Sequence, residues 1–211
     1  MQILRIRSAH ATCRRALAAA AIALSALALA AEPPVPHVAI DVRQSGDIFV
    51  VDANFFAPVP PAVAWEVLTD FDRMETFVPN LVDSRIVMRD GNRLSILQHG
   101  VARFGLLSLR FESMRTVTLT PTSSIRSTQL RGTMNRLDSL TTFAPEGDGT
   151  RLRYHVEAIP GVPLPDVVTK GFLRHEIAEQ FDAILREMAR RHRGRSRRRA
   201  RPQAASLRLV C

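Results

Sequence analysis

The chain has 211 residues, of which 46% are hydrophobic, so it is long enough for one domain with a buried core. Its net charge of +9 belongs to the two ends. Thirteen of the 29 Lys and Arg residues lie in the first fifteen positions or from Arg190 onward, and the 16 that remain face 20 acidic residues. The central part is therefore slightly acidic, and we do not expect it to bind nucleic acid.

Residues 1–30 have the pattern of a cleavable secretory signal. Basic residues extend to Arg15, and an apolar run from Ala16 to Ala30 is followed by a polar, proline-rich stretch. The run is shorter than the roughly 20 residues that a membrane-spanning helix needs. We therefore expect cleavage after Ala30 or Ala31, instead of a membrane anchor, and a periplasmic or secreted protein.

The next segments predict a lead-in, one strand and two short helices. Residues 31–45 contain several prolines and are expected to precede the domain. The β-branched and aromatic stretch DIFVVDANFF at 47–56 predicts the first strand. Prolines end it, and apolar residues at helical spacing predict a helix from Pro61 to Thr69. A second helical piece is expected from Met74 to Phe77, capped by Asp70 or Asp72.

After Leu81 the apolar pattern has a period of two, which is typical of half-buried antiparallel strands. The sequence Asp-Gly-Asn at 90–92 predicts a hairpin, and further strands are expected near 107–119, 125–131, 135–143 and 151–158. In the last of these, Tyr154 shares the apolar register, whereas His155 lies on the charged face. The pattern predicts six or seven strands in total.

The end of the chain predicts a long helix and a basic tail. Apolar residues at spacings of three and four, from Leu173 to Met188, predict a helix of about 25 residues that packs against the sheet. Residues 191–211 are rich in arginine and lack apolar periodicity, so we expect a disordered tail there. Such a tail is either solvated or attached to an anionic membrane surface.

This order of elements resembles that of the START-like (SRPBCC) superfamily. The segment FFAPVPPAVAWEVLTDFDRMETFVPNLVDSRIV at 55–87 resembles the opening of its polyketide cyclase/dehydrase and coenzyme Q-binding group, and GDGTRLRYHVEAIPGVPLP at 147–165 resembles the end. The resemblance implies an α+β helix-grip fold, also called Bet v 1-like, over residues 46–190. In that fold a curved antiparallel sheet wraps the C-terminal helix and leaves an apolar cavity between them.

The resemblance also implies where a ligand would lie. The candidate cavity residues are Phe77, Leu81, Phe104, Leu109, Phe111, Arg131, Tyr154, Val168 and Phe172. Members of the group often carry a tryptophan in the penultimate strand, where this chain has Ser139, Leu140 and Thr141. The floor of the cavity is therefore expected to differ from theirs.

We interpret the chain as a protein that binds or carries a hydrophobic small molecule, such as a lipid or an isoprenoid quinone, and we name no catalytic residue and no cofactor. One alternative is an enzyme of the cyclase or aromatase type, which would need a polar group inside the cavity. Another is an interaction module of the ribosome-associated toxin kind, against which export argues. No metal site is expected, because His175-Glu176 is followed by Glu179 where H-E-x-x-H zinc sites have a second histidine.

Overall fold

The computed structural model of the chain describes residues 38–161 and 165–200. One antiparallel sheet contains its eight strands in the order β1-β2-β8-β7-β6-β5-β4-β3. The strands are β1 (Ala39–Ser45), β2 (Ile48–Ala57), β3 (Leu81–Asp90), β4 (Arg93–Phe104), β5 (Leu107–Thr120), β6 (Ser124–Gly132), β7 (Arg136–Glu146) and β8 (Gly149–Ile159). Helix α1 (Pro61–Leu68) and the 3₁₀ helix η1 (Phe71–Thr76) follow β2, and helix α2 (Asp166–Ala200) follows β8.

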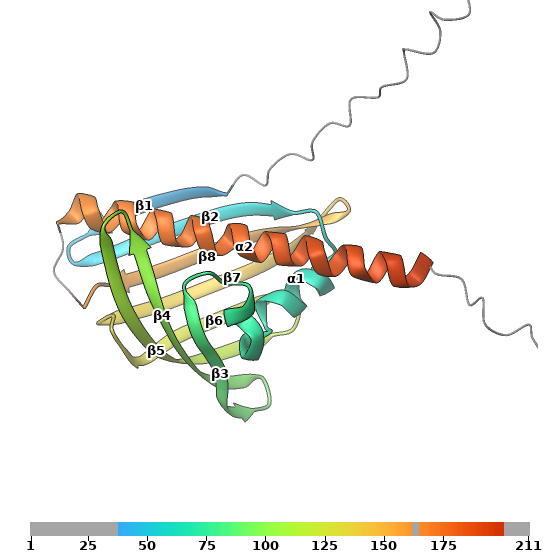
Figure 1. Cartoon of the computed structure of the whole chain (residues 1–211), viewed down its shortest axis with the longest axis horizontal. Coiled ribbons are helices and arrows are strands. Elements are labelled where there is room, and N and C mark those ends of the chain that lie inside the picture. The colour runs from blue at the N-terminus through green and yellow to red at the C-terminus, as the bar shows by residue number, and fades with distance from the viewer. Residues whose placement is uncertain (1–37, 162–164, 201–211) are drawn as a thin grey trace, which may run out of the picture. The chain divides into compact units, whose positions relative to one another are not determined.

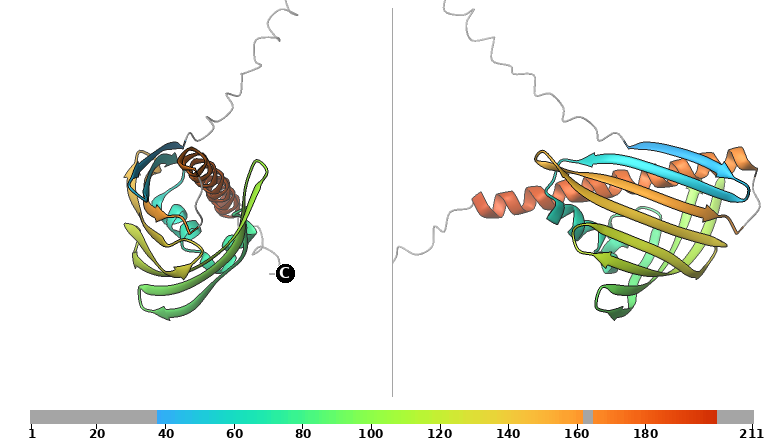
Figure 2. Two further views of the ribbon diagram at one scale, coloured as in Figure 1. Left: turned by 90° about the vertical axis from the view of Figure 1, so that its left-hand side faces the viewer. Right: turned by 180° about the vertical axis from the view of Figure 1, so that it is seen from behind.

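The sheet curves around α2, which runs along its concave face (Figures 1 and 2). Helix α2 packs most closely against β1, β2, β4 and α1. This arrangement is the predicted helix grip, because the long apolar stripe of α2 needs a concave apolar surface to cover it. Among the described residues, no helix is both long and apolar enough to span a membrane.

The best packed part of the core lies where β2 and β8 meet α1 and the second half of α2. Val51, Phe55 and Leu152 are 0% exposed, and Met188 of α2 is equally covered. The rings of Phe55 and Phe181 lie 4.4 Å apart between centroids. Large side chains therefore fill this end of the grip completely.

Several local predictions are confirmed. Helix α1 spans Pro61–Leu68, and Asp90 pairs with Arg93 across the predicted hairpin. Gly91 in that turn has a φ of 53°, a conformation that glycine adopts without steric strain. The second helical piece is present as η1, but it begins at Phe71 instead of Met74. A cap by Asp70 is wrong, because its carboxylate makes no capping hydrogen bond.

The predicted lead-in contains a strand, so the sheet has eight strands and not six or seven. Ile40 and Val42 alternate with Asp41 and Arg43 in β1, which pairs with β2 along its whole length. The turn between them contains Gly46 with a φ of 59°. The prolines before residue 37 concealed this pattern, because they end two residues before the strand begins.

Helix α2 continues to Ala200, about ten residues beyond its predicted end, so the expectation of a disordered tail is wrong for residues 191–200. Arg191 is the reason: its side chain is 9% exposed and pairs with Asp70 at 2.6 Å and with Glu187 at 2.7 Å. Arg195 pairs with Glu66 of α1. Glu66, Asp70 and Glu187 thus neutralise arginine charges that would repel one another in an isolated tail. Residues 201–211, and the signal predicted over residues 1–30, lie outside the described residues.

Candidate functional site

A band of polar side chains crosses the inner face of the sheet, the face turned toward α2. Strand pairing identifies its members, because Arg115 lies opposite Ile96 and Tyr154 lies opposite Thr141, in register with buried apolar neighbours. The members of the band are Gln98, Ser113, Arg115, Ser127, Gln129, Ser139, Thr141 and Tyr154. Five neighbouring strands, β4 to β8, therefore contribute polar groups to the interior.

Arg115 is the one charged member of this band. Its Nη2 donates a hydrogen bond to the Oε1 atom of Gln98. Gln98 is oriented for that role, because its Nε2 donates to Ser84 Oγ at 2.9 Å and Ser84 Oγ in turn donates to the Phe71 carbonyl at 2.6 Å. The amide of Gln98 thus presents its oxygen, and not its nitrogen, to the guanidinium.

The charge of Arg115 is not compensated. Among the described residues, no carboxylate pairs with it, and its buried Nε finds no hydrogen-bond partner. Burial lowers the pKa of Arg115, and its titratable neighbour is Tyr154. A part-buried cation that faces the interior without a counter-ion is costly, so this group indicates a binding function and not a stabilising one.

Tyr154 supplies a neutral polar group beside that cation. Burial raises the pKa of its phenol, while the nearby Arg115 charge and the Ser139 hydroxyl oppose the shift. The Tyr154 ring packs edge-on against Phe181 of α2, with centroids 5.1 Å apart. Ser127, which is 5% exposed, also has a hydroxyl with no partner among the described residues. Two donors without acceptors, Arg115 Nε and Ser127 Oγ, thus lie on the inner face near Tyr154.

The interior around this band differs from the filled core near α1. Inward-facing Leu109, Phe111, Arg115, Gln129 and Tyr154 all keep part of their surface accessible, although they point toward the helix. Since α2 makes its close contacts with β1, β2 and β4, the inner faces of β5 to β7 are less tightly covered. Solvent, or a ligand in its place, can therefore reach the band.

Residues 57–185 match the family described as polyketide cyclase/dehydrase and lipid transport. The chain belongs to this family. The match begins at the end of β2 and runs into α2, so it includes every strand that contributes to the polar band. No curated protein matches the chain in sequence.

Solved structures of similar fold include both carriers and enzymes by name. The STAR-related lipid transfer protein of Xanthomonas axonopodis has a TM-score of 0.61 at 13% identity, covering 74% of this chain and 99% of its own. The Zhui aromatase/cyclase of Streptomyces sp. R1128 has 0.57 at 15% identity, covering 75% and 99%. Human StAR-related lipid transfer protein 5 has 0.58 at 11% identity, covering 84% and 97%. At these identities the likeness concerns the fold alone.

The residues expected to line the family's cavity fall into three groups. Leu109, Phe111 and Tyr154 lie on the inner face of the sheet. Phe104, at the end of β4, packs edge-on against Phe172 with centroids 6.3 Å apart, near Val168 in the first turns of α2. Phe77 follows η1 and Leu81 begins β3, and both pack against the core. Whether these residues contact a ligand stays a prediction.

Arg131 lies elsewhere. Its side chain is 68% exposed on the outer face of the sheet, 3.9 Å from a carboxylate oxygen of Glu112. A bulge in β6 is the cause: Arg115 pairs with Gln129, but Met114 pairs with Arg131, so Leu130 is the extra residue. The expected inward position of Arg131 is thus wrong, and Arg115 is the arginine that faces the interior.

The outer face has a hollow of its own, of about 550 Å³, over β1, β2, β7 and β8. Asp52 and His155 line it with their side chains 2.7 Å apart, and Asp41 and Arg153 lie nearby. His155 therefore faces outward, as the alternation predicts. Asp41 and Asp52 also pair with Arg43, so these carboxylates have partners, in contrast to Arg115 on the inner face.

Proposed function

We propose that the chain binds and carries a hydrophobic small molecule that has an oxygen-rich polar end, held between the sheet and α2. The polar end would accept hydrogen bonds from Arg115, Tyr154 and Ser127, and the apolar body would lie along Leu109 and Phe111. Burial of such a body contributes roughly 25 cal/mol per Å². The observation that carries the proposal is the inward-facing, part-buried Arg115, which has no carboxylate partner among the described residues and whose buried Nε has no hydrogen-bond partner.

The chemistry of the band favours particular ligands. Three hydrogen-bond donors suit an acceptor such as a carboxylate, a phosphate or a carbonyl oxygen. A lipid head group and an isoprenoid quinone both provide such acceptors on an apolar body. To test this, the protein would be purified without detergent and its organic extract analysed by mass spectrometry. A recurring apolar species near one per chain is expected, and repeated absence of any such species would contradict the proposal.

A cyclase or aromatase activity is the second candidate, and the proximity of Tyr154 to Arg115 favours it. A neutral phenol beside a fixed cation can donate a proton to a developing oxyanion that the cation stabilises. The variant Tyr154→Phe separates the two functions. A carrier would lose only the affinity contributed by one hydrogen bond and has no turnover to lose, whereas an enzyme would lose turnover by about 100-fold or more.

We also propose that the protein acts outside the cytoplasm, as the sequence pattern of residues 1–30 predicts. This location supports carriage, because a hydrophobic molecule cannot cross an aqueous compartment alone. The N-terminal sequence of protein isolated from the periplasm or the medium tests it. A first residue at Ala31 or Glu32 is expected, and recovery of the protein only from the cytoplasm, with Met1 intact, would contradict export.

The basic end of α2 is a proposed contact for anionic membranes. Arg193, Arg197 and Arg198 are exposed, unlike the paired Arg191. Replacement of these three by Gln should weaken binding to phosphatidylglycerol vesicles and leave phosphatidylcholine unaffected. The matched control replaces Arg89, Arg93 and Arg126, which are exposed on the sheet. Equal losses in both triple variants would show that only net charge matters and would contradict a specific basic contact.

A further inference from the structure

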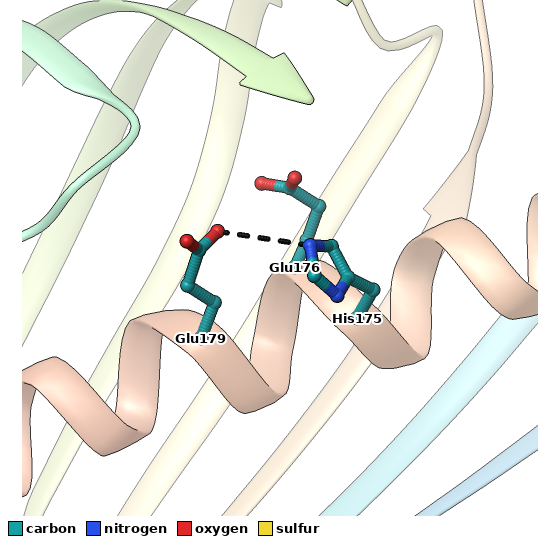
Figure 3. A group of neighbouring side chains, drawn as sticks. All are labelled: His175, Glu176 and Glu179. Atoms are coloured by element: carbon teal, nitrogen blue, oxygen red, sulfur yellow. Dashed lines mark ion pairs between the residues drawn. The ribbon is translucent and has the colours of Figure 1, made fainter. Parts of the chain in front are cut away.

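A second cluster of polar side chains lies on α2, away from Arg115. His175, Glu176 and Glu179 each offer one atom that can bind a metal, and these atoms lie within 4.8 Å of one another. The Nε2 atom of His175 is 3.9 Å from Glu179 Oε2, and Figure 3 shows the two side chains turned toward each other on successive turns. The three residues thus form one face of the helix at spacings of one and four.

Asn80 completes the cluster from the opposite side. It lies in the loop between η1 and β3, is 5% exposed, and is fixed by its carbonyl, which accepts a hydrogen bond from Val101 N at 2.9 Å. Its side-chain amide contacts Glu176 Oε2 at 2.8 Å and Glu179 Oε2 at 2.9 Å. Rotation of that amide by half a turn places its oxygen where its nitrogen now lies. Which orientation is favoured depends on the groups that the amide contacts: carboxylates favour the nitrogen, and a bound cation would favour the oxygen.

The two carboxylates lack a cation. Glu176 is 6% exposed, and its Oε1 is buried with no hydrogen-bond partner among the described residues. Neither glutamate pairs with a Lys or Arg in the part of the chain that the structure describes, and the neighbour of Glu179 is the His175 imidazole, which is a cation only when protonated. Two acidic groups that share one amide, one of them buried, call for a positive partner.

We propose that His175, Glu176, Glu179 and Asn80 bind one divalent transition-metal cation, which clips α2 to the loop between η1 and β3. One imidazole nitrogen with carboxylate and amide oxygens is a ligand set that suits Zn²⁺ or Mn²⁺ better than Mg²⁺. The missing H-E-x-x-H pattern excludes a zinc site with two histidines on one helix. It does not exclude the proposed site, in which Glu179 occupies the position of the second histidine. The proposal does not depend on the hydrophobic ligand.

The test measures Zn²⁺ and Mn²⁺ binding to the full-length, untagged, metal-free chain by isothermal titration calorimetry, with Mg²⁺ for comparison. We expect one Zn²⁺ per chain and a higher melting temperature when it binds. His175→Gln should lower Zn²⁺ affinity by about tenfold or more and remove the thermal shift. His175 is half-exposed, so this variant is expected to fold. His155→Gln is the matched control, because His155 also lies beside two carboxylates, Asp52 and Glu157.

A second variant tests the role of Asn80. Asn80→Asp should bind Zn²⁺ at least as tightly as the unchanged chain, because a carboxylate replaces an amide oxygen among the ligands. It should also depend on the metal for its stability. The proposal is overturned if no Zn²⁺ binds at one per chain, if His175→Gln binds it as tightly as His155→Gln, or if folded Asn80→Asp loses binding.

Discussion

The Nη2 atom of Arg191 lies 2.6 Å from Asp70 Oδ2, so a residue near the end of α2 is fixed to the residue that precedes η1. Both side chains are largely buried, with exposed fractions of 9% and 17%. The guanidinium of Arg191 also lies over the Phe77 ring, 5.6 Å from its centroid. This contact holds the last third of α2 against the two short helices.

Arg191→Leu should therefore destabilise the fold by about 3 kcal/mol, because it leaves Asp70 and Glu187 without a shared, buried partner. Urea denaturation followed by circular dichroism measures the change. Arg190→Leu is the control: Arg190 is 69% exposed, and loss of its pair with Glu187 should cost about 1 kcal/mol or less. Equal effects of the two variants would show that Arg191 does not form this link.

The same cluster predicts how stability changes in acid. Hydrogen bonds from Arg73 and then Arg191 lower the pKa of Asp70, and those from Arg190 and Arg191 lower the pKa of Glu187. A carboxyl whose pKa is lower in the folded state stabilises the fold above its unfolded pKa of about 4. That contribution is lost as pH falls through the folded pKa.

The free energy of unfolding should thus decrease below about pH 4–5, and it should decrease less in Arg191→Leu. Urea titrations at a series of pH values from neutral to acid measure both curves. Parallel curves for the two proteins would show that Arg191 does not lower these pKa values.

Gly100 is a position where backbone and side chain meet closely. A Cβ atom there would lie 2.1 Å from the Asn80 carbonyl oxygen and 2.4 Å from Cζ of Phe111. Gly100→Ala should cost about 1–3 kcal/mol by overpacking. Gly194→Ala, in α2 with nothing within 4 Å, should instead stabilise the chain by up to about 1 kcal/mol. Thermal denaturation of both variants measures this, and a neutral Gly100→Ala would contradict the packing.

Arg115→Met tests whether Arg115 is kept for binding and not for stability. Removal of a part-buried charge that has no counter-ion should leave the free energy of unfolding unchanged or raise it by about 1–2 kcal/mol. Chemical denaturation of ligand-free protein measures it. A loss of several kcal/mol would show that Arg115 supports the fold, and it would contradict the inference that Arg115 is kept to bind a ligand.

Much of the fold could be predicted because its signals are local. The period-two alternation places Tyr154 inward and His155 outward, and the Asp90-Gly91 turn marks a hairpin without knowledge of any distant residue. Each of these features depends on neighbours within a few positions. The helix grip was implied by the resemblance of this order of elements to the START-like superfamily.

The rest depends on partners far away in the sequence. Helix α2 continues past residue 190 because Arg191 meets Asp70, 121 positions earlier. The bulge at Leu130 reverses the face of Arg131, since a slip of one residue turns every later side chain over. No local pattern in β6 announces that bulge.

Arg115 was missed for a different reason. It occupies an inward position in the same alternation as Phe111, Ser113 and Val117, so its register was available in the sequence. An arginine is expected to face solvent, and a charged residue in an apolar register is easily read as an irregular position. This conflict between a charged side chain and an inward register was the feature of the sequence that could have identified Arg115 as a site residue.

The most direct test of the central claim compares Arg115→Met with Arg131→Met, two equal substitutions on opposite faces of the sheet. The amount of apolar ligand that copurifies with each protein is measured by mass spectrometry against a known standard. We expect Arg131→Met to retain the ligand content of the unchanged chain, whereas Arg115→Met should lose most of it. Equal ligand content in the two variants would contradict the claim that the inward-facing guanidinium of Arg115 holds the ligand.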